Sequence, residues 1–463
     1  MSKQAVSRKE WMTQGPIMPM LLTLSAPLMF NNLVRTFYTV ADGLYLAQLS
    51  AEDFAASSFS WPLNNLFISI GMGIGVAATA LIAHFIGSNQ LKKIQVYLDS
   101  TLFLTLALGA MLTVLGIASS EWLLKAMGGQ GSFLQKSDLY LKISFLGLFF
   151  DFGFFAYQSI LNAQGMTKTL TIISAISMGV NLLLDPFFIY DQVPVLYWSG
   201  LGWGIAGAAW ATLISKWVLL ALAAWIVAKQ SAIKPSRKWF RWDLGSQGHI
   251  LRMALPSALG YGGSSLGFTV MNALITSYGT NTLAAFSMIN RVSDIVMQPQ
   301  MGVGMALTPI IGQNMGAKQF DRAHLIFKRA IQFILGMSIL ASACILLGQE
   351  PILRLFIKAD APRDLWNQAR EYLYYSAFII FFMGLFNALN GFFQGCGQTK
   401  YSMFMTMGRL WLIRVPIVFL LGRLTDLGST GIWISMLISN MGIVVWGFYI
   451  YRRNNWELMS QMA

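Results

Sequence analysis

The chain has 463 residues, of which 56% are hydrophobic and only 11% are charged. Soluble domains carry about 25% charged residues, so this composition argues against a soluble multidomain enzyme and predicts a protein that lies mostly in a membrane. The net charge of +13 comes from basic residues between apolar runs, so it indicates membrane topology rather than a nucleic-acid-binding surface.

Apolar runs separated by glycine, proline or charged breaks predict twelve membrane-spanning helices, because one span needs about 20 apolar residues. The first run is too long for a signal peptide and has no small-residue cleavage site, so it is expected to remain as a span. In chain order the spans cover about residues 17–48, 54–86, 98–122, 138–163, 169–190, 203–228, 254–278, 283–311, 330–349, 371–393, 402–423 and 430–451. The sequence therefore predicts an all-α polytopic membrane protein.

Lysine and arginine residues between the spans are more numerous on the side of the N-terminus than on the opposite side. The positive-inside rule then places both termini in the cytoplasm, which agrees with an even number of spans. We expect a multi-pass protein of the cytoplasmic (inner) membrane.

An internal repeat is visible at an offset of 229 residues. Small residues of the first half return in register in the second half, and both halves have the same orientation. The pairs are Gly73 and Gly302, Gly75 and Gly304, Ala77 and Ala306, Thr79 and Thr308, and Gly87 and Gly316. The repeat predicts two six-helix lobes related by an axis along the membrane normal, with substrate bound between them. The expected division is an N-lobe at 1–228, which carries a cation-coupling site, a cytoplasmic linker at 229–253 and a C-lobe at 254–463.

Two carboxylates fall within predicted spans of the first half. Asp42 lies in the outer half of the first span, and Asp185 lies in the outer half of the fifth, one turn after Asn181. A charged group within a membrane is costly and points to function, and two close carboxylates can share a proton or hold a cation. Met271 and the stretch 414–417 occupy the equivalent positions of the second half, so the acid pair is confined to the first.

The remaining intramembrane acids receive structural interpretations. Asp294 follows Arg291 by three residues on one helix face, which predicts an internal ion pair. Asp151 is expected to cap a helix or line an inner polar surface. Pro27 lies within the first span and is expected to let this helix bend.

Methionine and aromatic side chains suit an adaptable apolar pocket that accepts cations. The candidates for such a substrate cleft are Tyr38, Met271, Met288 and Met301. The two cysteines and three histidines have no zinc or redox spacing, so neither a metal cluster nor a cofactor is expected.

Four stretches together resemble the multidrug and toxic compound extrusion (MATE) transporters, and within that family the DinF-like branch. They are ADGLYLAQLSAEDFAA, GIGVAATALIAHFIGSNQ, NLLLDPFFIY followed by GLGWGIAGAAWATLIS, and PIIGQNMGAKQFDRA. The resemblance implies a V-shaped antiporter that expels organic cations and other amphiphiles against proton or sodium entry. It also implies an ion-coupling site formed by Asp42, Asn181, Asp185, Thr212 and Gln158.

Two features depart from the family pattern. Gln158 stands where the family often has asparagine, and the nine residues DQVPVLYWS are inserted after the fifth span. Branches with a second-half cation site carry acids at 254–278 and 372–393, and this chain has none there.

The resulting hypothesis is a monomeric multidrug antiporter that works by alternating access. Protons are the expected coupling ion, although sodium at Asp42, Asn181, Asp185 and Thr212 stays open. Its partners would be small amphiphiles, the coupling ion and membrane lipid, with no nucleic acid. One alternative is a flippase for a lipid-linked precursor, which would use basic residues within the spans to grip phosphate; these are Arg35, Lys216, Arg291, Arg409 and Arg414. An intramembrane enzyme is disfavoured because the spans contain no nucleophile, metal cluster or histidine–acid pair.

Overall fold

The computed structural model describes residues 3–193, 198–236, 239–240, 243–357 and 361–457. These residues form helices almost throughout. The helices are α1 (Lys3–Gln14), α2 (Ile17–Leu49), α3 (Ala51–Gly87), α4 (Leu91–Ala126), α5 (Gly131–Ala163), α6 (Thr167–Ile189), α7 (Gly204–Gln230), α8 (Leu244–Thr276), α9 (Thr280–Gly316), α10 (Phe320–Leu347), α11 (Gln349–Phe356), α12 (Arg363–Gly395), α13 (Thr399–Met407), the π-helix η1 (Gly408–Arg414), α14 (Val415–Leu424) and α15 (Ser429–Arg453).

The predicted spans correspond to the long helices of the structure, with α13, η1 and α14 together forming the eleventh span. Within the described part of the chain, 10 helices are long and apolar enough to cross a membrane. The helices α8 and α9 have 33 and 37 residues, which also suffices in length, but glycine, proline and amide residues make them more polar. The chain is therefore a multi-pass helical membrane protein, as the sequence predicted.

Three local features differ from the prediction. The helices α1 and α11 were not expected, because both are short, α1 is polar and α11 is only weakly apolar. The eleventh span, expected as one α-helix over 402–423, is interrupted by the π-helix. The helix α8 begins at Leu244, so the segment between the halves is shorter than the expected linker at 229–253.

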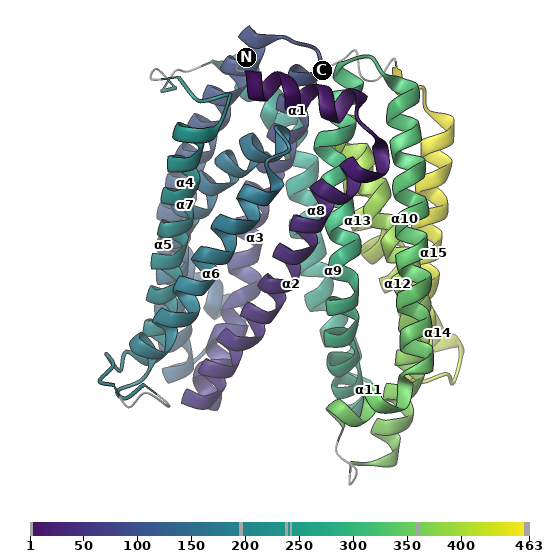
Figure 1. Ribbon diagram of the computed structural model, residues 1–463. Coiled ribbons are helices and arrows are strands. Elements are labelled where there is room, and N and C mark those ends of the chain that lie inside the picture. Colours follow the sequence, from purple (N-terminus) through teal and green to yellow (C-terminus); the bar gives the residue numbers. More distant parts are fainter. Residues whose placement is uncertain (1–2, 194–197, 237–238, 241–242, 358–360, 458–463) are drawn as a thin grey trace.

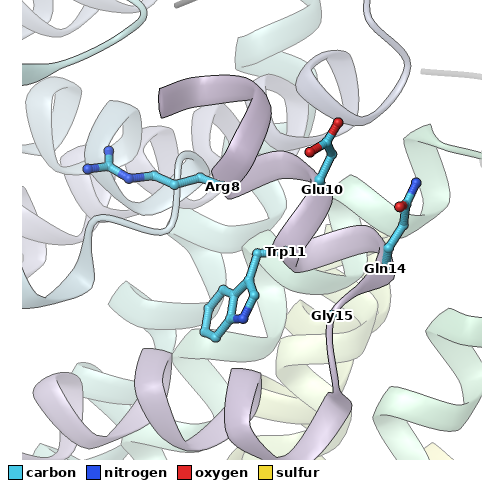
Figure 2. A pocket seen from close by; sticks show the side chains of 5 residues that line it. All are labelled: Arg8, Glu10, Trp11, Gln14 and Gly15. Carbon is cyan, nitrogen blue, oxygen red and sulfur yellow. The ribbon is translucent and has the colours of Figure 1, made fainter. Parts of the chain in front are cut away.

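The helices form two groups that meet at the end where both termini lie and diverge toward the opposite end (Figure 1). The short helix α1 lies across the joined end. Its residue Lys9 donates to Asn89 Oδ1 after α3 over 2.7 Å, and Asn314 of α9 donates to Met12 O over 3.1 Å. Figure 2 shows the surface pocket beside α1, which is lined by Arg8, Glu10, Trp11, Gln14 and Gly15. Helix α1 thus contacts both repeats at this end.

The repeated glycines mark the places where the two halves touch. A Cβ atom on Gly73 of α3 would lie 2.6 Å from Ala258 N of α8. The equivalent Cβ on Gly302 of α9 would lie 2.7 Å from Met29 N of α2. Since Met29 and Ala258 are also 229 residues apart, the two contacts are related by the internal repeat. The predicted two-lobed repeat is confirmed.

The closest approach is at the joined end, between the last turns of α3 and α9. A Cβ on Gly87 would lie 2.0 Å from Gln313 O, and a Cβ on Gly316 would lie 2.0 Å from His84 O. Real Cβ atoms do not approach backbone oxygens so closely, so any side chain here would force the two helices apart. Glycine is required at both positions because the helix backbones themselves are in contact.

We expect Gly87→Ala and Gly316→Ala each to destabilise the protein by about 1–3 kcal/mol, the usual cost of overpacking a buried contact. The measurement is the thermal unfolding midpoint of the purified protein in detergent. Gly336→Ala is the matched control, because this glycine of α10 has nothing within 4 Å of its Cβ position. An unchanged midpoint for both Gly87→Ala and Gly316→Ala would mean that α3 and α9 can move apart at this contact without loss of stability.

Candidate functional site

The centre of the candidate site is a carboxylate–amide pair on α6. Asn181 Nδ2 donates to Asp185 Oδ1 over 3.0 Å, and the two side chains are buried, with 1% and 0% exposure. Their spacing of four residues places them on one face of the helix in adjacent turns. The second oxygen of Asp185 and the amide oxygen of Asn181 are buried without a hydrogen-bond partner. The pair therefore presents two unused oxygen acceptors.

Asp42 of α2 contributes the second carboxylate. It is half-buried, and its Oδ1 atom is buried without a hydrogen-bond partner. The carboxylates of Asp42 and Asp185 lie close enough for their negative charges to repel each other. Neither acid belongs to any of the ion pairs found among the described residues. Two neighbouring carboxylates without a basic partner require a proton or a bound cation to offset their charge.

Hydroxyl groups complete the surroundings of the two acids. Tyr38 lies one turn before Asp42 on α2 and is within interaction range of both carboxylates and of Thr212 on α7. Tyr140 of α5 is also within electrostatic range of Asp42 and Asp185. The structure thus brings together four of the five predicted coupling residues and one predicted cleft residue, Tyr38.

Tyr140 was missed by the sequence analysis. The sequence could have identified it, because Tyr140 lies in the outer part of the fourth predicted span. Asp42 and Asp185 were also expected in the outer halves of their spans. Another tyrosine holds the outer ends of the helices in place, because Tyr190 after α6 donates to Tyr45 O of α2 over 2.8 Å. Tyrosine hydroxyls therefore surround the carboxylates on several sides.

The structure does not bring Gln158 to this group. Gln158 and Tyr140 both lie on α5, and at 1.5 Å per residue they are about 27 Å apart along its axis. Since Tyr140 is the α5 residue near the acids, Gln158 lies toward the opposite end of the helix. The expectation that Gln158 joins the ion-coupling site is wrong. The resemblance matched Gln158 to a motif position in the sequence, and a sequence match does not show how far along α5 the residue lies from the two acids.

The predicted cleft methionines have different surroundings. Met271 is only 1% exposed and packs in the apolar core of the C-lobe with Phe286 and Trp433, so it is not a cleft residue. Met288 is half-buried against the same cluster. Met301 of α9 is 37% exposed, next to the contact between Gly302 and α2. Met301 remains a candidate for contact with substrate.

The structure differs from the sequence-based interpretation at two further acids, Asp151 and Asp294. Asp151 of α5 forms an ion pair with Lys216 of α7 at 2.7 Å. The expected pair of Arg291 and Asp294 is not formed, since no ion pair joins these two described residues and both side chains are exposed. A helical spacing of three residues allows such a pair but does not require it.

The arrangement suits a proton or a hard monovalent cation. Carboxylate, amide and hydroxyl oxygens are the ligands that such cations prefer, and the same carboxylates accept protons. In the described part of the chain no group of three or more histidine, cysteine, aspartate or glutamate residues could hold a metal ion. The two acids lie on different helices, α2 and α6, which contact each other, so the distance between the carboxylates depends on the relative positions of these helices.

Comparisons with known proteins identify the family and the fold of the chain. A family model described as MatE matches residues 27–187 and 256–420. The probable multidrug resistance protein YpnP of Bacillus subtilis (strain 168) is 25% identical over 450 residues, which is 97% of this chain and 98% of that protein. A protein of Shewanella oneidensis named FAD transporter is 26% identical over 451 residues, or 95% of each chain. A crystal structure of MATE in the straight conformation has a TM-score of 0.87 at 25% identity and covers 98% of both chains.

Proposed function

The chain belongs to the MatE family of multidrug transporters, and from this premise we propose that it is a secondary active exporter that exchanges organic cations and other amphiphiles for protons. The observation that carries the proposal is the pair of carboxylates, Asp42 and Asp185, which have unused oxygens and form no ion pair with any described basic residue. Such a pair is a site for a transported cation rather than a structural ion pair. The proton is preferred because the neighbouring groups are hydroxyls and one amide, and sodium is the second candidate for the same oxygens.

The proposed mechanism is alternating access. In the structure the helix groups diverge at the end away from the termini, where the acids of α2 and α6 lie (Figure 1). A proton that enters from outside would remove the repulsion between Asp42 and Asp185, let α2 approach α6, and release substrate outward. Exchange then requires only that the proton and the substrate prefer different states of the protein.

The proposal also covers the location, topology and oligomeric state of the protein. We place it in the cytoplasmic membrane as a monomer, with both termini in the cytoplasm and no enzymatic activity. The two lobes divide between α7 and α8, with the ion-coupling site in the N-lobe and the C-lobe lacking an equivalent acid pair. A lipid flippase is not favoured, because the acid pair Asp42 and Asp185 suits a transported cation rather than a phosphate group.

The test is transport by the purified protein in lipid vesicles, with ethidium as the organic cation. A pH gradient and a sodium gradient are imposed separately, and ethidium movement is followed by fluorescence. We expect the pH gradient to drive ethidium against its concentration gradient, while a response to sodium alone would identify sodium as the ion. Ethidium movement that is the same with both gradients collapsed would contradict an antiporter.

The expected bend of α2 at Pro27 has a specific partner. The helix continues from Ile17 to Leu49 through Pro27, whose ring removes one backbone hydrogen bond. Thr171 of α6 donates to Pro27 O over 2.8 Å, which ties the weakened point of α2 to the helix that carries Asp185. We propose that this bond fixes where α2 bends.

We expect Thr171→Val to lower the rate of ethidium export about fivefold. The free energy of unfolding should fall by no more than about 1 kcal/mol, which is the usual contribution of one hydrogen bond. Thr171→Ser keeps the hydroxyl and is expected to restore the wild-type rate. Equal rates for the valine and serine variants would sink the idea that the Thr171 hydroxyl guides the bend.

A further inference from the structure

The π-helix η1 brings two arginines of the C-lobe to the same side. Arg409 and Arg414 are five residues apart, so in an α-helix they would point about 140° away from each other. In a π-helix the hydrogen bonds join residues i and i+5, as from Val415 N to Leu410 O here, and residues five apart lie on the same side of the helix. Single turns of π-helix inside α-helices occur frequently at functional sites.

Both arginines are buried within the helix bundle, with 6% and 4% exposure. Their hydrogen-bond partners are neutral. Arg409 Nη1 donates to Asn440 Oδ1 over 3.0 Å and contacts Met383 Sδ at 2.8 Å, while Arg414 Nε donates to Ser439 Oγ over 3.0 Å. The Arg409 Nε atom is buried without any partner. The two guanidinium groups carry ten N–H groups, and the protein contacts named here use only a few of them.

The positive charge of the two arginines is not offset by an acid. The ion pairs of the described residues include neither Arg409 nor Arg414. The guanidinium groups also lie close enough to repel each other. A buried charge without a counter-charge is strongly unfavourable, and two neighbouring like charges are more so. An anion that binds between them would remove both costs.

The internal repeat places this charge in relation to the acids of the N-lobe. At the offset of 229 residues, Arg414 occupies the position of Asp185. Ser439, which accepts from Arg414, ends a Leu-Ile-Ser triplet that also occurs at 213–215, where Ser215 O accepts from Ser177 of α6. The two lobes therefore carry opposite charges at equivalent positions.

The surroundings of Arg409 suit the apolar part of a ligand. Its guanidinium group lies 4.9 Å from the centre of the Phe386 ring and against the Met383 thioether. The Met383 side chain is flexible enough to move aside and make room for an anion. We propose that Arg409 and Arg414 bind the anionic group of an amphiphilic substrate, so that the exported compounds include anionic and zwitterionic amphiphiles. The proposal rests on the proposed function in that the bound molecule is the exported one.

The experiment compares two dyes that share a ring system and differ in charge. Fluorescein is anionic and tetramethylrhodamine methyl ester is cationic, and binding of each to the purified full-length protein in detergent is followed by fluorescence anisotropy. We expect Arg409→Gln and Arg414→Gln each to weaken fluorescein binding at least about tenfold, as for the loss of a charge-assisted hydrogen bond. Binding of the cationic dye should stay the same or become tighter.

Two further variants separate binding from folding. Arg423→Gln removes an exposed arginine at the end of α14 and should leave the binding of both dyes unchanged. Arg409→Met replaces the buried charge with an apolar side chain of similar length. It should lose fluorescein affinity while the thermal unfolding midpoint stays equal or rises, because an uncompensated buried charge is removed.

The proposal is overturned if fluorescein binds equally to wild type and both glutamine variants, or if Arg409→Met lowers the midpoint while fluorescein affinity is kept. A lipid headgroup carries the same chemistry, so short-chain phosphatidylglycerol is added as a competitor. Arginine-dependent binding of that lipid without any of fluorescein would overturn a soluble amphiphile as the ligand. Arginine-dependent fluorescein binding without gradient-driven transport would instead contradict the proposed function and leave the anion site standing.

Discussion

Replacing Asp185 with asparagine is expected to weaken strongly the response of ethidium export to a pH or sodium gradient. The carboxylate is fully buried, holds Asn181 through one oxygen and leaves the other free. An asparagine side chain has similar shape and can keep the contact with Asn181, but it can neither accept a proton nor offset a cation. We expect gradient-driven transport to fall by about 5–150-fold, the range of typical coupling free energies.

The experiment measures transport and binding on the same preparation. Asp42→Asn should have the same effect on gradient-driven transport, because the two acids act on each other's charge. Asp426→Asn is the matched control, since this aspartate is exposed after α14. Ethidium binding in detergent should persist in the Asp185 variant. Gradient-driven transport at the wild-type rate in both site variants would remove the acids from the mechanism.

Breaking the pair of Asp151 and Lys216 is expected to have the largest effect on stability. The two side chains are only 14% and 17% exposed, and they join α5 to α7 at 2.7 Å. Removing one partner, in Asp151→Leu or Lys216→Met, leaves the other charge buried and uncompensated. We expect each single variant to lose about 3 kcal/mol of unfolding free energy.

The double variant Asp151→Leu/Lys216→Met is expected to recover most of this loss, because a buried ion pair can often be replaced by apolar groups at little cost. Chemical unfolding of the purified proteins in detergent gives the three free energies of a double-mutant cycle. The prediction fails if the single losses add up in the double variant, since the two charges would then not depend on each other. Transport activity of the double variant would separately show whether this pair is needed beyond folding.

The helices of this fold could be predicted because membrane spans have a fixed length and an apolar composition. The acids Asp42 and Asp185 could be singled out for the complementary reason, since a charge inside a span is rare and costly. The repeated glycines Gly87 and Gly316 were visible as a sequence match, but only the structure assigns them to the backbone contact between α3 and α9.

Other features could be assigned only from the three-dimensional structure. The depth of Gln158 along α5 excludes it from the site, and the burial of Met271 excludes it from the cleft. The π-helix could not be predicted, because nothing in the residue types of Gly408–Arg414 distinguishes hydrogen bonds between residues five apart from those between residues four apart. Tyr140 comes within electrostatic range of the acids only in the folded lobe, where α5 contacts α6 and α6 contacts α2.

The contact of α3 and α9 at Gly87 and Gly316 determines how the joined end can open. Long side chains can stretch and keep touching while helices move apart, so contacts made by them weaken gradually. At these two glycines the backbones touch without any side chain between them, and such a contact is lost after a small displacement. The end that holds both termini should therefore be either sealed or open, with few intermediate positions through which protons or solutes could leak.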